Sequence, residues 1–245
     1  MKNPFRYFKA SPEIIRLAVL MYVRYPLSLR QVEDLLHQRG IDISYETVRA
    51  WWNRFGPIFA AEIKKCRSAA LRNSPQWKWH LDEVFVRING EIYYLWRAVD
   101  HAGEVLEAFV TMKRDREAAL KFLKKAMKLY GRPGVVVTDR LRSYRAAMTM
   151  IGNEARQETG RWLNNRAENS HQPFRRRHAL ARFRKQRFQG QRAMAKFRSE
   201  KSLQSFVSIH SSIHNLFNQE RHLYNRNDFK LNRSAALAEW WQIAA

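Results

Sequence analysis

Residues 77–112, WKWHLDEVFVRINGEIYYLWRAVDHAGEVLEAFVTM, predict three consecutive β-strands. Aromatic and β-branched residues dominate this stretch, and these residue types are enriched in strands. Asn89-Gly90 is a strong signal for a two-residue hairpin turn, and His101-Ala102-Gly103 marks a second turn. Strands joined by such short turns pair antiparallel. We therefore expect one antiparallel ladder with strands over 77–88, 91–99 and 105–112.

The segment that follows predicts alternating helices and strands. Asp115 suits the N-cap of a helix through Tyr130, and Gly131 to Gly134 end that helix. Val135-Val136-Val137 is a short continuous apolar run, typical of a buried parallel strand. A helix over 141–151, a short strand over 155–159 and mainly helical chain from residue 165 complete the pattern. This order predicts an α/β fold of the ribonuclease-H-like class, with one mixed sheet flanked by helices.

The first 72 residues predict an all-α segment. Ser11-Pro12-Glu13 is a helix start, Ser28 and Gln31 suit a capping box, and Ser44 caps a third helix. A further helix is expected over 57–71. Composition changes after Asn73-Ser74-Pro75. The predicted domains are therefore a helix-turn-helix domain over 1–72, a catalytic domain with a basic helical extension over 73–222, and a C-terminal tail over 223–245.

The connection between the second and third predicted helices, residues 40–43, has a length that suits a helix-turn-helix. In that motif the N-terminal part of the last helix enters the major groove of DNA. Its outer face would carry Tyr45, Glu46, Arg49 and Asn53. The alternative is an ordinary three-helix bundle that does not contact DNA.

The charge of the chain favours a polyanionic partner. Its formal net charge is +23 and its isoelectric point about 10.7. Nucleic acid is the first candidate, an anionic membrane surface the second, and a basic protein without such a partner the third. The single cysteine, Cys66, excludes a disulfide scaffold or a thiolate zinc site within one chain. The apolar run Leu17 to Val23 is short for a signal-peptide core and lacks a small-residue cleavage site, and no stretch approaches the roughly 18 apolar residues of a membrane span. We expect a cytoplasmic protein without membrane contacts.

Three acidic residues occupy positions that suit metal ligands. Asp82 lies inside the first predicted strand, and Asp139 directly follows the apolar strand, where open α/β sheets bind ligands. Glu168 lies in the first turn of a predicted helix that begins near Asn164-Asn165. For Asp139 the alternative is a helix cap, and for Glu168 it is a first-turn acid favoured by the helix dipole. Because successive strand residues face opposite ways, only one of Asp82 and Glu83 is expected in a given site, and periodicity does not choose between them.

Convergence of these acids would require a cation. Carboxylates about 4 Å apart repel by roughly 4 kcal/mol per pair at an effective dielectric of about 20. Mg²⁺ prefers oxygen ligands from a few carboxylates together with water and phosphate. Two such ions suit the displacement chemistry of phosphodiesters. We therefore expect two Mg²⁺ ions, for which Mn²⁺ would substitute.

A basic tract follows Glu168. Residues 175–201 contain 11 lysines or arginines and one acid, Glu200, with phenylalanines interleaved. This bias predicts phosphate contacts, with the aromatic rings packed inward or stacked on bases. Together with the outer face of the third helix, the expected DNA-binding residues are Tyr45, Arg49, Asn53, Arg166, Arg175, Arg176, Arg177, Arg182, Arg184 and Lys185.

The chain resembles the DDE transposases of bacterial insertion sequences, in particular the cointegrate-forming IS-six family. The stretches that carry the resemblance are WHLDEVFV, LWRAVDHAG, VVVTDRLRSY, QETGRWLNNRAENSHQPFRRR and HNLFNQERHLY. The resemblance implies a ribonuclease-H-like catalytic domain behind a helix-turn-helix. It also implies that Asp82, rather than Glu83, joins Asp139 and Glu168 in the catalytic triad, and that Arg175 is the basic residue such families carry after the Glu.

The activity implied by the resemblance is Mg²⁺-dependent cleavage at the 3′ ends of the element and joining to target DNA, by a homodimer or larger homo-oligomer on paired ends. The alternative is a catalytically inactive DNA-binding repressor. Two departures stand out. The second Asp and the Glu are 29 positions apart, which is shorter than in the best-known members, and Arg140 stands where many relatives have Lys.

Overall fold

The computed structural model describes residues 3–25, 27–72, 78–139, 141–160, 163–171, 197–218 and 224–243. Six of the predicted DNA-binding residues lie outside these ranges, namely Arg175, Arg176, Arg177, Arg182, Arg184 and Lys185. The contacts divide the chain into two compact units, one built on the N-terminal helices and the C-terminal helix and one built on the sheet. Within the described ranges, the divisions fall after Lys64 and after Ser211, inside the helices over residues 45–72 and 200–217.

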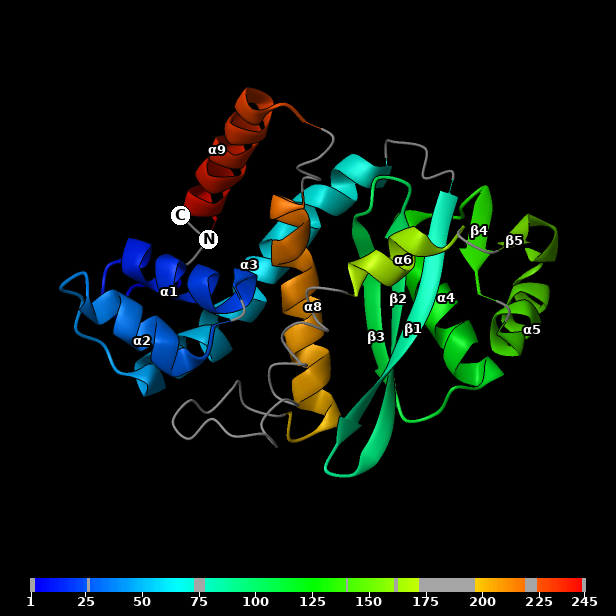
Figure 1. Ribbon diagram of the computed structural model, residues 1–245, viewed down its shortest axis with the longest axis horizontal. Helices are drawn as coiled ribbons and strands as arrows, with labels where there is room; N and C mark the ends of the chain where they lie inside the picture. The colour runs from blue at the N-terminus through cyan, green and yellow to red at the C-terminus, as the bar shows by residue number, and fades with distance from the viewer. Residues whose placement is uncertain are drawn as a thin grey trace. The chain divides into compact units, whose positions relative to one another are not determined.

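The second unit contains the predicted mixed sheet of five strands (Figure 1). In chain order these are β1 (Lys78–Ile88), β2 (Glu91–Asp100), β3 (Val105–Thr111), β4 (Val135–Thr138) and β5 (Gln157–Thr159). Their order across the sheet is β3-β2-β1-β4-β5, with β1, β2 and β3 antiparallel and β4 and β5 parallel to β1. This is the ribonuclease-H-like arrangement that the sequence predicts.

The hairpin turn sets the register of β1 and β2. Asn89 and Gly90 have φ values of 52° and 94°, the two positive values that a type I′ turn requires. The register then runs from Ile88 opposite Glu91 to Trp79 opposite Asp100, and it sets Asp82 opposite Arg97. A one-residue slip would move every side chain to the other face of the sheet, so this turn decides which face carries Asp82.

Helices α4 (Arg116–Tyr130) and α5 (Arg142–Ile151) cover one face of the sheet. As predicted, Asp115 caps α4, because its side chain accepts a hydrogen bond from the Ala118 amide at 2.9 Å. The core on this face centres on the buried Trp96, whose ring meets that of Tyr144 edge to face at 5.4 Å. Aromatic pairs in this geometry stabilise a core beyond their buried area.

The short helix α6 (Asn165–Ser170) covers the opposite face, in front of β1 and β2 in Figure 1. Its Ala167 packs in a small cluster with Val99 and Val105. Further along the chain, α8 (Glu200–Phe217) protects the outer edge of β3: the Gln204 side chain accepts from the Val110 amide at 2.8 Å and donates to the Ala108 carbonyl at 3.0 Å. A side chain thereby satisfies backbone groups that an open sheet edge would leave exposed.

The first unit contains α1 (Pro12–Arg24), α2 (Leu29–His37), the first part of α3 (Tyr45–Arg72) and α9 (Arg226–Gln242). The predicted caps are present, including the reciprocal capping box of Ser28 and Gln31. Trp240 of α9 packs edge to face on Phe59 at 5.3 Å, and the Arg16 Nε donates to the Ile243 carbonyl at 2.9 Å. The segment expected as a C-terminal tail is thus largely a helix that packs in this unit.

The structure corrects one helix prediction. The helix capped by Ser44 and the separate helix expected over 57–71 form the single helix α3, with Pro57 inside it. Proline removes one backbone hydrogen bond. The buried stripe of Phe55, Phe59 and Ile63 continues on both sides of it, so packing offsets the local cost. No helix within the described ranges has the length and apolarity needed to cross a lipid bilayer.

A candidate metal centre of carboxylates

The site lies where β1 and β4 separate. The two strands pair in parallel through Lys78–Val135, Trp79–Val136 and His80–Val137, and the pairing then stops. Asp82 stands two residues beyond the last pair on β1, and Asp139 stands two residues beyond it on the β4 side. The two predicted acids therefore occupy matching positions at the carboxyl end of β4, where open sheets bind ligands.

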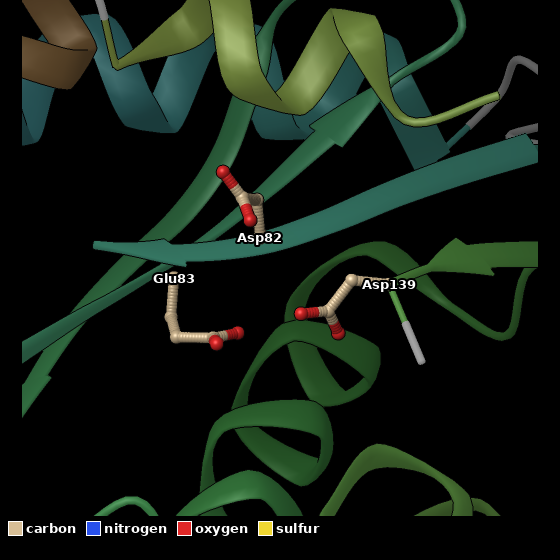
Figure 2. Close-up of side chains that lie close together, drawn as sticks. All are labelled: Asp82, Glu83 and Asp139. Carbon is tan, nitrogen blue, oxygen red and sulfur yellow. The ribbon is translucent and has the colours of Figure 1, made fainter. Parts of the chain in front are cut away.

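The oxygens that Asp82, Glu83 and Asp139 offer all lie within 4.8 Å of one another (Figure 2). The expectation that only one of Asp82 and Glu83 could approach the site is wrong. Their side chains do leave β1 in opposite directions, as Figure 2 shows, but the longer Glu83 side chain turns its carboxylate back toward Asp139. It has room to do so because the pairing of β1 with β4 ends at His80.

The three carboxylates differ in their access to solvent. The side chain of Glu83 is 3% exposed, that of Asp82 is 13% exposed, and that of Asp139 is 40% exposed. Burial has the largest effect on the pKa of Asp82, and together with the negative charges of Glu83, Asp139 and Glu168 it raises that pKa to about 7. Burial and the charge of Asp139 also raise the pKa of Glu83, against the opposing effect of Arg114.

This set of donors fits a divalent cation. It supplies only carboxylate oxygens, the ligands that Mg²⁺ and Mn²⁺ favour. Burial and the neighbouring acids raise the pKa of Asp82, and a bound cation would favour its ionised form. Asp82 and Asp139 are the residues that would hold the ion, since they meet from adjacent strands and Asp139 is open to solvent.

Glu168 lies on α6, on the same side of the sheet as Asp82. Its side chain is exposed, and its charge contributes to the raised pKa of Asp82. Its carboxylate is not a member of the group of acids within 4.8 Å among the described residues. The structure thus joins Asp82 with Asp139 directly, and the part of Glu168 in the metal centre stays a prediction.

Three contacts seat α6 on the sheet beside Asp82. The Asn164 side chain donates to the Leu81 carbonyl at 2.7 Å, and the Arg97 guanidinium donates to the Ser170 carbonyl. At the end of the helix, the buried His171 places its Nε2 3.4 Å from the Asp82 Oδ2. These contacts hold both ends of the helix that carries Glu168.

Arg97 is a residue whose role the sequence did not reveal. It is 1% exposed, directly opposite Asp82 in the register, and burial lowers its pKa to about 10. Its Nε and Nη2 have no hydrogen-bond partner among the described residues. A buried guanidinium is costly. The hydrogen bond to the Ser170 carbonyl indicates that Arg97 serves to hold α6. In the sequence, the only indication of this role was the place of Arg97 within a predicted strand.

The raised pKa of Asp82 predicts how metal binding depends on pH. Between about pH 4 and 7 the folded protein keeps a proton on Asp82 that the unfolded chain releases, because the carboxyl titrates near 3.8 when unperturbed. Through this group, the metal-free protein loses stability as the pH rises across that window. A cation needs the ionised carboxylate, so its affinity should fall roughly ten-fold per pH unit below 7.

The measurement is the increase in Tm that Mg²⁺ produces at pH 8 and at pH 6. We expect the larger increase at pH 8. The variant Asp82→Asn is the control, since it should lose most of the increase at both pH values. Equal increases for the unaltered protein at the two pH values would contradict the assignment of Asp82 as a metal ligand.

The predicted DNA-binding residues that the structure describes are accessible, Tyr45 in part. Arg49 and Asn53 are exposed near the start of α3, where Arg49 forms an ion pair with Glu46 at 2.9 Å. The Arg49 guanidinium also lies 5.6 Å from the centre of the Tyr45 ring. In the other unit Arg166 is exposed on α6, and its charge helps to lower the pKa of His80, after the effect of burial.

Residues 76–220 match a protein family described as a DDE domain. A Staphylococcus aureus transposase for the insertion sequence-like element IS431mec is 33% identical over 174 residues, covering 69% of this chain and 75% of that protein. The Staphylococcus aureus transposase for insertion sequence element IS257 in transposon Tn4003 has the same identity and coverage. The HTLV-2 integrase catalytic core domain in complex with magnesium reaches a TM-score of only 0.39 at 14% identity, covering 62% of this chain and 91% of that one, which is too low to bear on the chemistry.

Proposed function

Because the chain belongs to the IS-six family of DDE transposases, we propose that it cleaves the 3′ ends of an insertion sequence and joins them to target DNA. The observation that carries this proposal is the meeting of Asp82 and Asp139 where β1 and β4 separate. Both acids lie inside the segment that matches the DDE domain. The net charge of +23 supports DNA as the substrate.

In this proposal Asp82, Asp139 and Glu168 hold the metal. Mg²⁺, when bound, supplies a Lewis acid that activates an attacking oxygen and stabilises a leaving one. The chain itself keeps Asp82 poised to ionise near neutral pH and seats α6 through Asn164 and Arg97. Two ions, as in other two-metal phosphoryl transfer sites, and replacement by Mn²⁺ are expected.

The N-terminal helices are proposed to recognise the terminal inverted repeats as a helix-turn-helix. What supports this is the exposure of Arg49 and Asn53 on the first turns of α3, after a connection of suitable length. Arg166 and the basic residues from Arg175 to Lys185 are proposed to bind the phosphate backbone. As an enzyme that joins two ends, the protein is expected to act as a homodimer or larger homo-oligomer in the bacterial cytoplasm.

Substitution of Arg49 by alanine should relax the preference for the terminal repeat. If this side chain contacts a base edge, its loss costs about 1–3 kcal/mol for the specific site and little for unrelated DNA. Competition binding with the terminal repeat and a scrambled duplex measures the ratio. The matched control is Arg54→Ala, which removes an exposed arginine from the same helix. An unchanged ratio for Arg49→Ala would remove it from the set of base-reading residues.

The function is tested by incubating the purified protein with labelled terminal-repeat DNA, a target plasmid and Mg²⁺. Cleaved ends and joined products are expected only when the metal is present. Specific binding without metal and without any nicking would instead identify a DNA-binding repressor. Cleavage of RNA–DNA hybrids, without cleavage of element ends, would identify a nuclease with the same fold.

A further inference from the structure

The third carboxylate of the cluster, Glu83, is held by a cation from the protein itself. The guanidinium of Arg114 forms an ion pair with the Glu83 Oε1. The same Arg114 nitrogen lies 3.7 Å from the Asp139 Oδ2. Arg114 thus lies between the buried Glu83 on β1 and the partly exposed Asp139 that follows β4, both of which belong to the candidate metal centre.

Glu83 differs from Asp82 in its surroundings as well as in its direction. Its side chain points to the face covered by α4 and α5. On that face burial raises the pKa of the Tyr144 hydroxyl, and the charge of Glu83 and a hydrogen bond to it raise that pKa further. With 3% exposure, Glu83 cannot reach a phosphate that approaches from solvent. Its Oε2 makes no hydrogen bond of full geometry among the described residues, although the nearby Tyr144 hydroxyl interacts with the carboxylate and opposes the rise that burial causes in its pKa.

The backbone of Arg114 is held by neighbouring contacts, while its side chain is partly exposed to solvent. Its side chain is 40% exposed, and its backbone carbonyl accepts from the Ser143 hydroxyl at 3.2 Å, which ties the segment before α4 to the start of α5. Asp115 next to it caps α4. The backbone is therefore anchored on both sides while the guanidinium reaches the two acids.

We propose that Arg114 is a positioning residue of the metal centre, which neutralises Glu83 and orients Asp139 so that the metal is held by Asp82 and Asp139 and not by Glu83. The proposal rests on the proposed function, because it explains how a cluster of three close acids presents only two to the metal. Ligand carboxylates are commonly oriented by such outer partners. The residue acts through Glu83 and Asp139 and does not itself touch the reacting atoms.

Removal of the guanidinium should change metal binding and activity in opposite directions. In Arg114→Met, a cation beside the site is lost and Glu83 is free to offer its oxygens to the ion. Binding of Mn²⁺, measured by electron paramagnetic resonance of the free ion and by calorimetry, should tighten by roughly ten-fold. Strand transfer should fall by roughly ten-fold or more, because the extra ligand draws the ion away from its working position.

A second substitution tests whether the loss of Arg114 changes metal binding and activity through Glu83. In the double variant Glu83→Gln with Arg114→Met, the extra ligand is neutral, so Mn²⁺ affinity should return toward that of the unaltered protein and strand transfer should recover at least in part. Such coupling between two substitutions is what a double-mutant cycle isolates. Arg116→Met is the matched control, since it removes an exposed arginine that lies two positions after Arg114 and pairs with Glu117 instead.

Weaker Mn²⁺ binding in Arg114→Met, unchanged strand transfer, or no recovery in the double variant would each overturn the proposal. Circular dichroism and Tm values establish that each variant is folded before it is compared. If the unaltered protein joins no DNA ends at all, the proposed function fails, whereas the Mn²⁺ titrations still decide whether Arg114 controls access of Glu83 to the metal.

Discussion

Replacement of Asp82 or Asp139 by asparagine should reduce strand transfer by roughly a thousand-fold or more. Asparagine keeps the shape of the side chain and removes the charge that holds the cation. The two acids meet at the end of β4, and the third acid of the cluster, Glu83, is held by Arg114. We expect the same loss for Glu168→Gln, as the proposed third ligand. Gel assays of end cleavage and end joining, at saturating Mg²⁺, measure the effect.

The asparagine variant at Asp82 should also be more stable than the unaltered protein at pH 8 without metal. The carboxylate is largely buried among other negative charges, which is why its pKa rises to about 7, and the neutral amide avoids that cost. A higher Tm together with lost activity separates a missing ligand from a damaged fold. Glu117→Gln, an exposed acid on α4, is the control expected to keep activity. Full activity in all three acid variants would show that the triad is wrongly assigned.

Binding to the terminal repeat should weaken steeply with salt. A protein that makes about 6–10 phosphate contacts loses roughly 10³–10⁵ in affinity between about 50 and 200 mM salt, because bound counterions are released. The net charge of +23 and the 11 basic residues of 175–201 motivate this expectation. Fluorescence anisotropy with a labelled duplex, across a series of salt concentrations, gives the slope.

Paired substitution of Arg176 and Arg177 by glutamine should lower that slope by about two and weaken binding to all sequences alike. The exposed Arg145 on α5, which forms an ion pair with Glu154 at 3.4 Å, offers a comparison, with Arg145→Gln expected to leave the slope nearly unchanged. A flat response to salt in the unaltered protein would contradict a phosphate-binding role for the basic tract. Salt and metal dependence would then have to be explained separately.

Local signals were sufficient for most of the elements. Asn89-Gly90 can adopt the two positive φ values of a hairpin turn, Asp115 caps α4 with its own side chain, and Val135-Val136-Val137 lies in a buried parallel strand. Each of these depends on residues within a few positions. The helix break expected near Pro57 was wrong, because the rule that proline ends a helix considers only nearby residues. In the fold, buried aromatic residues on both sides of Pro57 stabilise one continuous helix.

In the candidate site, too, local signals identify some residues and only the tertiary structure places the others. The sequence marks Asp82 by its polarity inside a strand and Asp139 by its place after one, so both could be named before the fold was known. It could not show that Glu83 turns back toward Asp139, since alternation describes where a side chain leaves the strand and not where its end lies. Nor could it connect Arg114 with either acid, across 31 positions to Glu83.

By itself, then, the amino-acid sequence determined the order of helices and strands and the positive charge, because periodicity, turns and caps act over short distances. It also identified Asp82 within one strand and Asp139 directly after another. Only the tertiary structure decided that Arg97 holds α6 through Ser170, that Arg114 joins two acids, and that the C-terminal helix packs with the first unit. Those contacts join residues far apart in the chain, and their geometry exists only once the sheet has paired and its two faces are covered.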